Sequence, residues 1–99
     1  MNLNLTLDLT SDLARPYFLW SEEMNLGELK AILAGDQGEY LQWVYSRRIL
    51  REARMQDVWV FFTPDWIAQN WGRLSPHLGR KRAFWEHCLE VWRKHGRLQ

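Results

Sequence analysis

The first residues of the chain alternate strictly between leucine and polar side chains. Leu3, Leu5, Leu7 and Leu9 occupy odd positions, and asparagine, threonine or aspartate fills the positions between them. Because the side chains of an extended strand point alternately to its two faces, this period predicts a strand with one apolar face. A helix would distribute leucines at this spacing around its circumference.

Such a strand needs a neighbour for its backbone N–H and C=O groups. The other strand-like segment of the chain is residues 58–62, VWVFF. The N-terminal arm, residues 1–15, is therefore expected to pair with that segment, with a second copy of itself, or with another protein. We favour intermolecular pairing of residues 2–10, since strand addition satisfies the backbone and gives the leucines pockets. The alternative is a tail without fixed structure.

After the arm the apolar spacing becomes helical. Asn25 followed by Glu28 is a capping-box signature, and the leucines and isoleucine that follow predict a helix over residues 26–34 that ends at Gly35. A longer amphipathic helix is expected over residues 39–54.

The second half carries further helix starts. Residues 57–62 are ambiguous: their β-branched and aromatic content suits a strand, yet Asp57 could cap a short helix, which we favour because helices flank the segment. Thr63, followed by proline and aspartate, is a strong start signal, and Ser75 with its following proline repeats it. The last helix is expected to begin near Arg80.

That last helix has apolar side chains at i, i+3, i+4 and i+7, namely Trp85, Cys88, Leu89 and Trp92. We expect this stripe to be buried against the helix over residues 39–54, on its residues Leu41, Val44 and Tyr45. The predicted fold is mainly α: one domain over residues 16–99, a small bundle of four to five short helices, preceded by the extended arm.

Composition adds two constraints. With 25% charged and 46% apolar residues the chain is expected to fold, and its seven tryptophans exceed what one small core easily holds. The net charge of +1 hides a split. Residues 1–46 carry two basic and seven acidic side chains, and residues 47–99 carry eleven and five. Either an electrostatic binding face or attraction between the two halves explains the split.

The sequence offers little for catalysis or metal binding. None of its serines lies in a nucleophile motif, and Cys88 falls within an apolar stripe, where a thiol is usually a small core side chain. The histidines lack the spacing of metal ligands. We therefore expect no enzyme activity and no cofactor. A single cysteine fits a cytoplasmic protein, and no apolar run is long enough to predict a membrane span.

Basic side chains gather at two places. Arg47, Arg51 and Arg54 share one helix face at i, i+4 and i+7, and Arg80, Lys81 and Arg82 open the last helix. Both groups are candidate partner-binding residues, together with the leucines of the arm. The alternative is a solvated surface, or ion pairs with Glu52, Asp57 and Glu86. Because the pI of about 7.9 is below that of a typical nucleic-acid-binding domain, a protein partner is favoured over nucleic acid.

Four strings carry a resemblance to a known group of proteins: YFLW at 17–20, RILREAR at 48–54, DVW at 57–59 and HLGRKRAFWE at 77–86. Over about Tyr17 to Gly96 the chain resembles small, uncharacterised bacterial proteins encoded beside nucleotidyltransferase toxins of the abortive-infection type. The resemblance implies an antitoxin-like partner that binds or restrains the toxin. The toxin's own pattern, Gly-Ser followed by paired aspartates, is absent.

Two hypotheses follow. The first is a non-catalytic protein-binding module of a defence or toxin–antitoxin operon, which pairs with the toxin, or with a second copy through the arm. The second is a small nucleic-acid-binding regulator that uses the arginine face.

Overall fold

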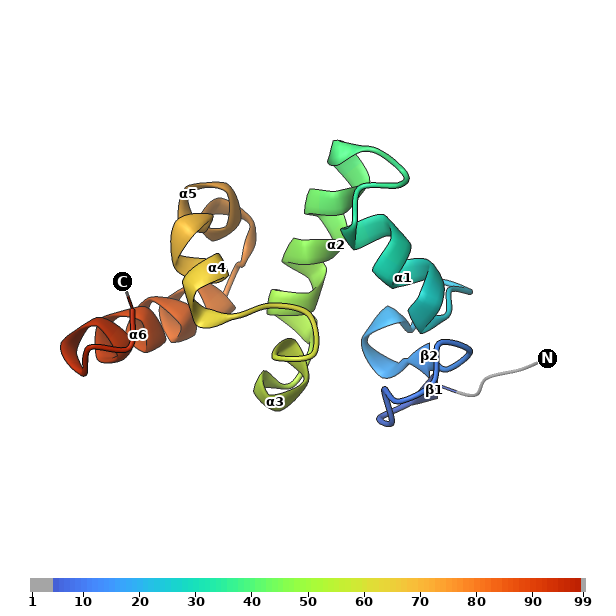
Figure 1. Cartoon of the computed structure of the whole chain (residues 1–99), viewed down its shortest axis with the longest axis horizontal. Coiled ribbons are helices and arrows are strands. Elements are labelled where there is room, and N and C mark those ends of the chain that lie inside the picture. Colours follow the sequence, from blue (N-terminus) through green and yellow to red (C-terminus); the bar gives the residue numbers. More distant parts are fainter. Residues whose placement is uncertain (1–4, 99) are drawn as a thin grey trace.

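The computed structural model describes residues 5–98, and within them the protein is mainly α-helical, as predicted. It is elongated, 47 × 26 × 22 Å, with the N-terminal strands and α1 at one end, α6 at the other, and α2 between them (Figure 1). In chain order the elements are β1 (Leu5–Thr6), β2 (Arg15–Pro16), the 3-10 helix η1 (Tyr17–Leu19), α1 (Leu26–Leu33), α2 (Glu39–Glu52), α3 (Met55–Val58), α4 (Pro64–Gln69), α5 (Trp71–Leu74), the 3-10 helix η2 (Ser75–His77) and α6 (Lys81–Lys94).

The N-terminus of α1 is capped twice. Asn25 and Glu28 form the predicted capping box: the Glu28 N–H donates to Asn25 Oδ1 (2.8 Å), and the Asn25 N–H donates to Glu28 Oε1 (2.9 Å). The first two N–H groups of the helix, which have no partner within a helix, donate to carbonyls of the arm. Leu26 N–H donates to Ala14 O (2.8 Å), and Gly27 N–H donates to Asp12 O (2.9 Å).

The arm therefore folds back onto α1. A β-carbon on Gly27 would lie 3.2 Å from Asp12 Cβ, so glycine permits this close approach. An ion pair between Lys30 and Asp12 (3.0 Å) closes the same contact. The arm thus supplies backbone acceptors to the helix, a role that its leucine pattern did not reveal.

The strand partner of the arm differs from the partners we expected. Leu5 and Thr6 pair in parallel with Arg15 and Pro16 of the same chain, and not with residues 58–62. Both strands of this two-stranded sheet are edge strands, where Pro16, which has no backbone N–H to donate, is tolerated. Leu3 lies outside the described residues. The other edge of β1 carries no strand within residues 5–98, so pairing with a second molecule stays a prediction.

Helix α6 docks on the C-terminal end of α2. The buried Trp85 indole N–H donates to Leu50 O (2.9 Å), a carbonyl that the last turn of α2 would otherwise leave without a partner. Trp85, Cys88 and Leu89 are buried as predicted, whereas Trp92 is only partly buried.

The fully buried part of α2 is its C-terminal end, and not the segment of Leu41, Val44 and Tyr45 against which α6 was expected to pack. Leu41, Val44 and Tyr45 are only half-buried, and Ile49 and Leu50 are fully buried. Because α6 meets α2 at its end, its aromatic stripe contacts the last turn and not the middle of the helix.

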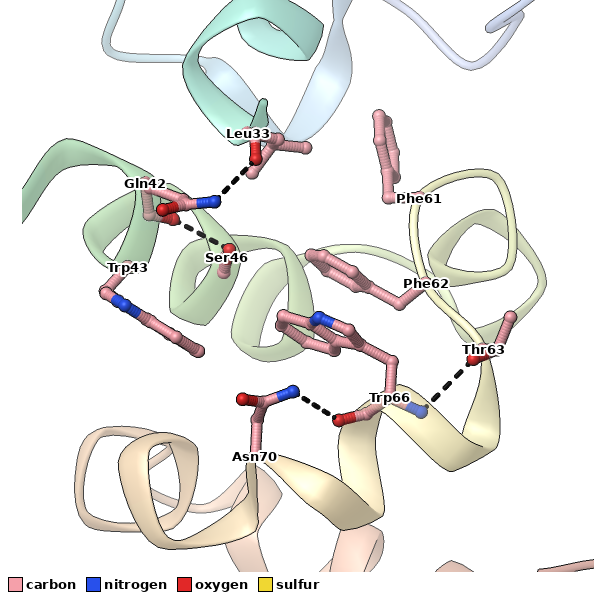
Figure 2. Close-up of a pocket in the computed structure, with 9 residues that line it drawn as sticks. All are labelled: Leu33, Gln42, Trp43, Ser46, Phe61, Phe62, Thr63, Trp66 and Asn70. Carbon is pink, nitrogen blue, oxygen red and sulfur yellow. Dashed lines mark hydrogen bonds between the residues drawn. The ribbon is translucent and has the colours of Figure 1, made fainter. Parts of the chain in front are cut away.

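Between α2 and α6 the chain forms short helical turns. Residues 57–62 form no strand, but the short helix α3 covers residues 55–58, so Asp57 lies inside the helix and does not cap it, and residues 59–62 are not helical. Thr63 caps α4 by accepting from the Trp66 N–H (3.1 Å, Figure 2), with Pro64 in the first turn. The second start signal, at Ser75, begins only the 3-10 helix η2. This subdivision gives more helices than the four or five predicted.

One core runs through these elements. Its buried apolar residues are Phe18, Leu19, Leu26, Leu29, Ile49, Leu50, Ala53, Val58, Phe62, Ile67, Leu74, Leu78, Trp85, Cys88 and Leu89. Burial raises the pKa of the Cys88 thiol, which keeps it protonated and inert, as expected for a core cysteine. Nowhere in residues 5–98 does a helix combine the length and apolar character needed to cross a bilayer.

Candidate interaction surfaces

The arginine face of α2 contacts the short helices that follow it in the chain. Arg47 Nε donates to the Arg73 carbonyl (3.1 Å), and Arg51 Nη1 donates to the His77 carbonyl (3.2 Å). These carbonyls lie in α5 and η2, so the two guanidinium groups hold the short helices against α2. Arg51 also pairs with Glu52 (3.4 Å), one of the internal acids considered above. Both side chains remain partly accessible, and their contact with a partner stays a prediction.

Arg54 belongs to a network that joins the N-terminal segment to α3. Its Nε lies 2.9 Å from Asp57 Oδ2, and the Tyr17 hydroxyl donates to the same oxygen (2.6 Å) while accepting from the Arg54 N–H (2.7 Å). Burial alone would raise the pKa of Asp57. The hydrogen bonds from Arg54 and Tyr17 outweigh it and hold the pKa below its ordinary value. Burial and the bond to Asp57 raise the pKa of Tyr17.

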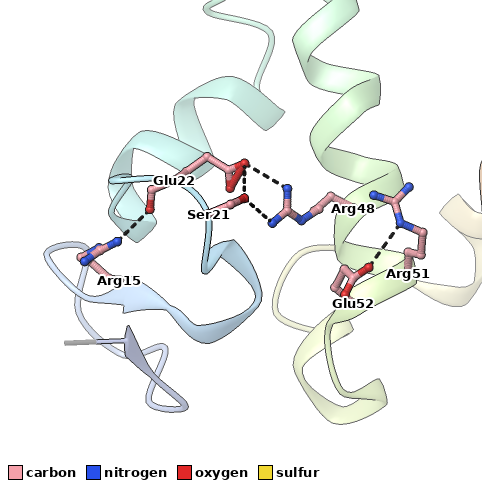
Figure 3. A network of polar contacts seen from close by, with 6 residues as sticks. All are labelled: Arg15, Ser21, Glu22, Arg48, Arg51 and Glu52. Atoms are coloured by element: carbon pink, nitrogen blue, oxygen red, sulfur yellow. Dashed lines mark hydrogen bonds and ion pairs between the residues drawn. The ribbon is translucent and has the colours of Figure 1, made fainter. Parts of the chain in front are cut away.

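A second polar network connects the acidic and basic halves of the chain (Figure 3). Arg48 pairs with Glu22 (3.0 Å) and donates to Ser21 Oγ (3.1 Å), while Arg15 Nη2 donates to the Glu22 carbonyl (2.8 Å). Arg73 and Glu39 form another ion pair between the halves (3.3 Å). Some acidic side chains of residues 1–46 therefore pair with basic side chains of residues 47–99 within the fold.

The basic residues at the start of α6 point to a different surface. Arg80 and Arg82 are exposed; Arg82 makes an ion pair with Glu86 (3.4 Å), and Arg80 makes none within residues 5–98. Lys81 Nζ lies 5.8 Å from the centre of the Phe84 ring. The structure thus places Lys81 beside an exposed aromatic side chain.

That side chain is part of an aromatic surface that the sequence analysis did not identify. Trp59 and Phe84 are 37% and 40% exposed, and each packs edge-on against the buried Trp85, at 5.9 and 5.0 Å between ring centres. Trp92 is partly exposed, and the centre of its ring lies 5.7 Å from the centre of the Trp59 ring. We call Trp59, Lys81, Phe84 and Trp92 the α3–α6 surface. The one feature of the sequence that pointed to this surface is its number of tryptophans, which exceeds what one small core can bury.

The arm contributes a smaller apolar area. Leu5 and Leu7 are 38% and 55% exposed, and Leu9 packs against the core. In the described part of the arm, two of the alternating leucines are therefore exposed to solvent and the third packs against the protein's own core.

Within residues 5–98, no three histidine, cysteine, aspartate or glutamate side chains gather closely enough to hold a metal ion. No protein-family model, curated protein or solved structure matches the chain.

Proposed function

We propose that this protein is a non-catalytic protein-binding module whose partner docks on the α3–α6 surface. The observation that carries the proposal is that Trp59 and Phe84 stay more than a third exposed while resting on the same buried Trp85. Two large rings supported by a rigid third ring form a preorganised apolar contact. Aromatic and arginine side chains are the residues that dominate interface energies.

The charge around this surface indicates the chemistry of the partner. Lys81 lies against Phe84, so the apolar centre has a cation at its border. Such a border favours association with an acidic patch. Nucleic acid is less favoured, because Arg47 and Arg51 already donate to carbonyls of the protein itself.

The resemblance supplies a specific candidate. Two of the strings that carry it, at 57–59 and 77–86, contain Trp59, Lys81 and Phe84. We therefore propose an antitoxin-like role: the protein binds or restrains a nucleotidyltransferase-type toxin by covering part of its surface. The edge of β1 that pairs with no strand in residues 5–98, near the exposed Leu5 and Leu7, offers the partner a second contact by strand addition.

This proposal can be tested by co-expressing the protein with the nucleotidyltransferase toxin whose gene, according to the resemblance, lies beside its own. Growth should recover when both proteins are present, and the two should co-elute in size-exclusion chromatography. The double variant Trp59→Ser/Phe84→Ser should lose both effects. Trp20→Ser is the matched control, because Trp20 is 66% exposed and lies outside the α3–α6 surface.

Two results would overturn the proposal. One is a double variant that rescues growth and co-elutes like the native protein. The other is binding to nucleic acid that weakens steeply with salt through counterion release, with no stable complex with the toxin.

A further inference from the structure

The loop between β1 and β2, residues 7–14, carries exposed leucine and aspartate side chains, and we call it the arm loop. Leu7 is 55% exposed and Leu13 is 82% exposed, and Asp8 and Asp12 are exposed as well. Because β1 and β2 pair with each other, the two ends of the loop meet. These four side chains therefore lie in one region at the N-terminal end of the molecule (Figure 1).

Hydrogen bonds hold the arm loop in a defined shape. Asp8 Oδ1 accepts from the N–H (3.1 Å) and the hydroxyl (2.7 Å) of Thr10, and the Ala14 N–H donates to the Ser11 carbonyl (3.0 Å). The Asp12 carbonyl accepts from the first turn of α1. A loop that is already ordered loses little conformational entropy when it docks, so its leucines form a preorganised apolar contact.

The two ends of the molecule differ in the sign of their charge. Residues 5–30 carry five acidic and two basic side chains, whereas residues 80–98 carry two acidic and six basic ones. Ion pairs within each end leave these excesses unchanged, and Arg48 of α2 neutralises one acidic side chain, Glu22. The N-terminal end thus keeps an acidic excess and the α6 end keeps a basic one.

This difference in charge determines how two copies of the chain can meet. A symmetric dimer brings the same surface of both copies together, so it would place an acidic end against an acidic end, or a basic end against a basic end. Like charges that face each other across an interface lower the affinity. A contact between the N-terminal end of one copy and the α6 end of the next places opposite charges together.

The apolar groups of the two ends also match in such a contact. The leucines of the arm loop would meet the exposed rings of Trp59 and Phe84, and its aspartates would approach Lys81, the cation beside Phe84. Within one molecule, β1 and β2 lie at one end and α6 at the other, with α2 between them (Figure 1). The arm loop therefore meets the α3–α6 surface of a different molecule.

We propose that, in the free protein, the arm loop of a second copy docks on the α3–α6 surface. This inference rests on the proposed function, since the docking surface is the same, and it adds a form of regulation in which the toxin displaces the second copy. A head-to-tail contact leaves one arm loop and one α3–α6 surface unoccupied in a pair of molecules. Further copies therefore add to the pair, which a symmetric dimer does not allow.

Sedimentation equilibrium of the native protein, without the toxin, tests the proposal. With rising protein concentration the average mass should increase from the 12.0 kDa of one chain to more than twice that value. Raising the ionic strength from about 0.01 M to about 0.15 M shortens the screening length from about 30 Å to about 8 Å and should lower the association constant about tenfold. A mass that stays at one chain, a plateau at two chains, or association that salt does not change would each overturn the proposal.

Complementary variants provide a second test. Leu7→Ser/Leu13→Ser removes the apolar contact of the arm loop, and Phe84→Ser removes a ring from the α3–α6 surface, so each variant alone should be monomeric. An equal mixture of the two should form a complex of two chains that grows no further, because one intact arm loop and one intact α3–α6 surface remain. Tyr40→Ser is the matched control: this side chain is 78% exposed and belongs to neither surface, and its variant should associate like the native protein.

A mixture that stays monomeric would overturn the proposal. If Phe84→Ser does not fold, Lys81→Glu takes its place, because it reverses the charge beside the ring. The two proposals fail separately. A native protein that stays monomeric but binds the toxin contradicts only the self-association, and a protein that self-associates through the arm loop without binding the toxin contradicts only the antitoxin-like role.

Discussion

Replacing Trp85 with phenylalanine should destabilise the protein through one specific bond. The Trp85 indole N–H is the donor to the buried Leu50 carbonyl at the end of α2, at 2.9 Å. Phenylalanine keeps an aromatic ring at this position but leaves that carbonyl without a donor. A buried polar group without a partner costs about 1–3 kcal/mol, and the smaller ring adds on the order of 1 kcal/mol for imperfect packing.

The expected loss in the free energy of unfolding is therefore about 2–4 kcal/mol, a large part of the roughly 5–15 kcal/mol of a typical domain. Urea unfolding followed by circular dichroism should show a midpoint lower by about 1–2 M, given slopes of roughly 1–3 kcal/mol/M. Trp59→Phe is the matched control, because the Trp59 side chain makes no hydrogen bond within residues 5–98, so that change removes packing alone and should cost less than Trp85→Phe. Equal midpoints for the two variants would refute the capping role of Trp85.

Further substitutions test other parts of the fold. Arg47→Ala and Arg51→Ala should each lower the free energy of unfolding by about 0.5–1.5 kcal/mol in urea titrations, since each removes a donor to a carbonyl; no loss would return these side chains to a purely solvated face. The folded-state pKa of Asp57 is depressed, so the ionised carboxylate stabilises the fold above about pH 4, and this stabilisation is lost as the pH falls through the folded-state pKa. Asp57→Asn should therefore flatten the acid side of the curve of unfolding free energy against pH. An unchanged acid side would contradict the network of Arg54, Tyr17 and Asp57. Gly27→Ala should destabilise, because its Cβ would meet Asp12 Cβ at 3.2 Å, whereas Gly72→Ala, in open space within a helix, should raise the melting temperature.

Local signals in the sequence predicted much of the fold correctly. The capping box at Asn25, the helix start at Thr63 and the buried positions Trp85 and Leu89 depend on residues within a few positions of one another. Capping preference and helical period act over one or two turns, so a single sequence contains them.

Contacts between distant segments were harder to predict. The carbonyls that accept from Arg47 and Arg51 lie 26 residues further along the chain. Because every residue has a backbone carbonyl, the residue types do not indicate which carbonyls will accept these bonds. The ion pairs of Arg51 with Glu52, Arg54 with Asp57 and Arg82 with Glu86 were among the alternatives considered from the sequence, and the structure contains all three. The arm was misjudged in a similar way, because its β partner Arg15 and its acceptors for α1 are set by backbone geometry.

The candidate surfaces also arise from tertiary packing. Trp59 directly follows α3 and Phe84 lies in α6, and the two are related only because both rest on Trp85. Trp43 of α2 and Trp66 of α4 are likewise 23 positions apart in the sequence, yet their rings lie nearly parallel. The surplus of tryptophan predicted exposed rings without indicating which ones.

The most direct test of the proposed function is the affinity of the protein for the nucleotidyltransferase-type toxin, measured by calorimetry for native protein, Trp59→Ala and Trp20→Ala. A central interface aromatic contributes about 2 kcal/mol or more, or roughly 30-fold in affinity. We predict a loss of this size for Trp59→Ala and native affinity for Trp20→Ala. Native affinity for both variants would contradict the assignment of the α3–α6 surface as the binding site.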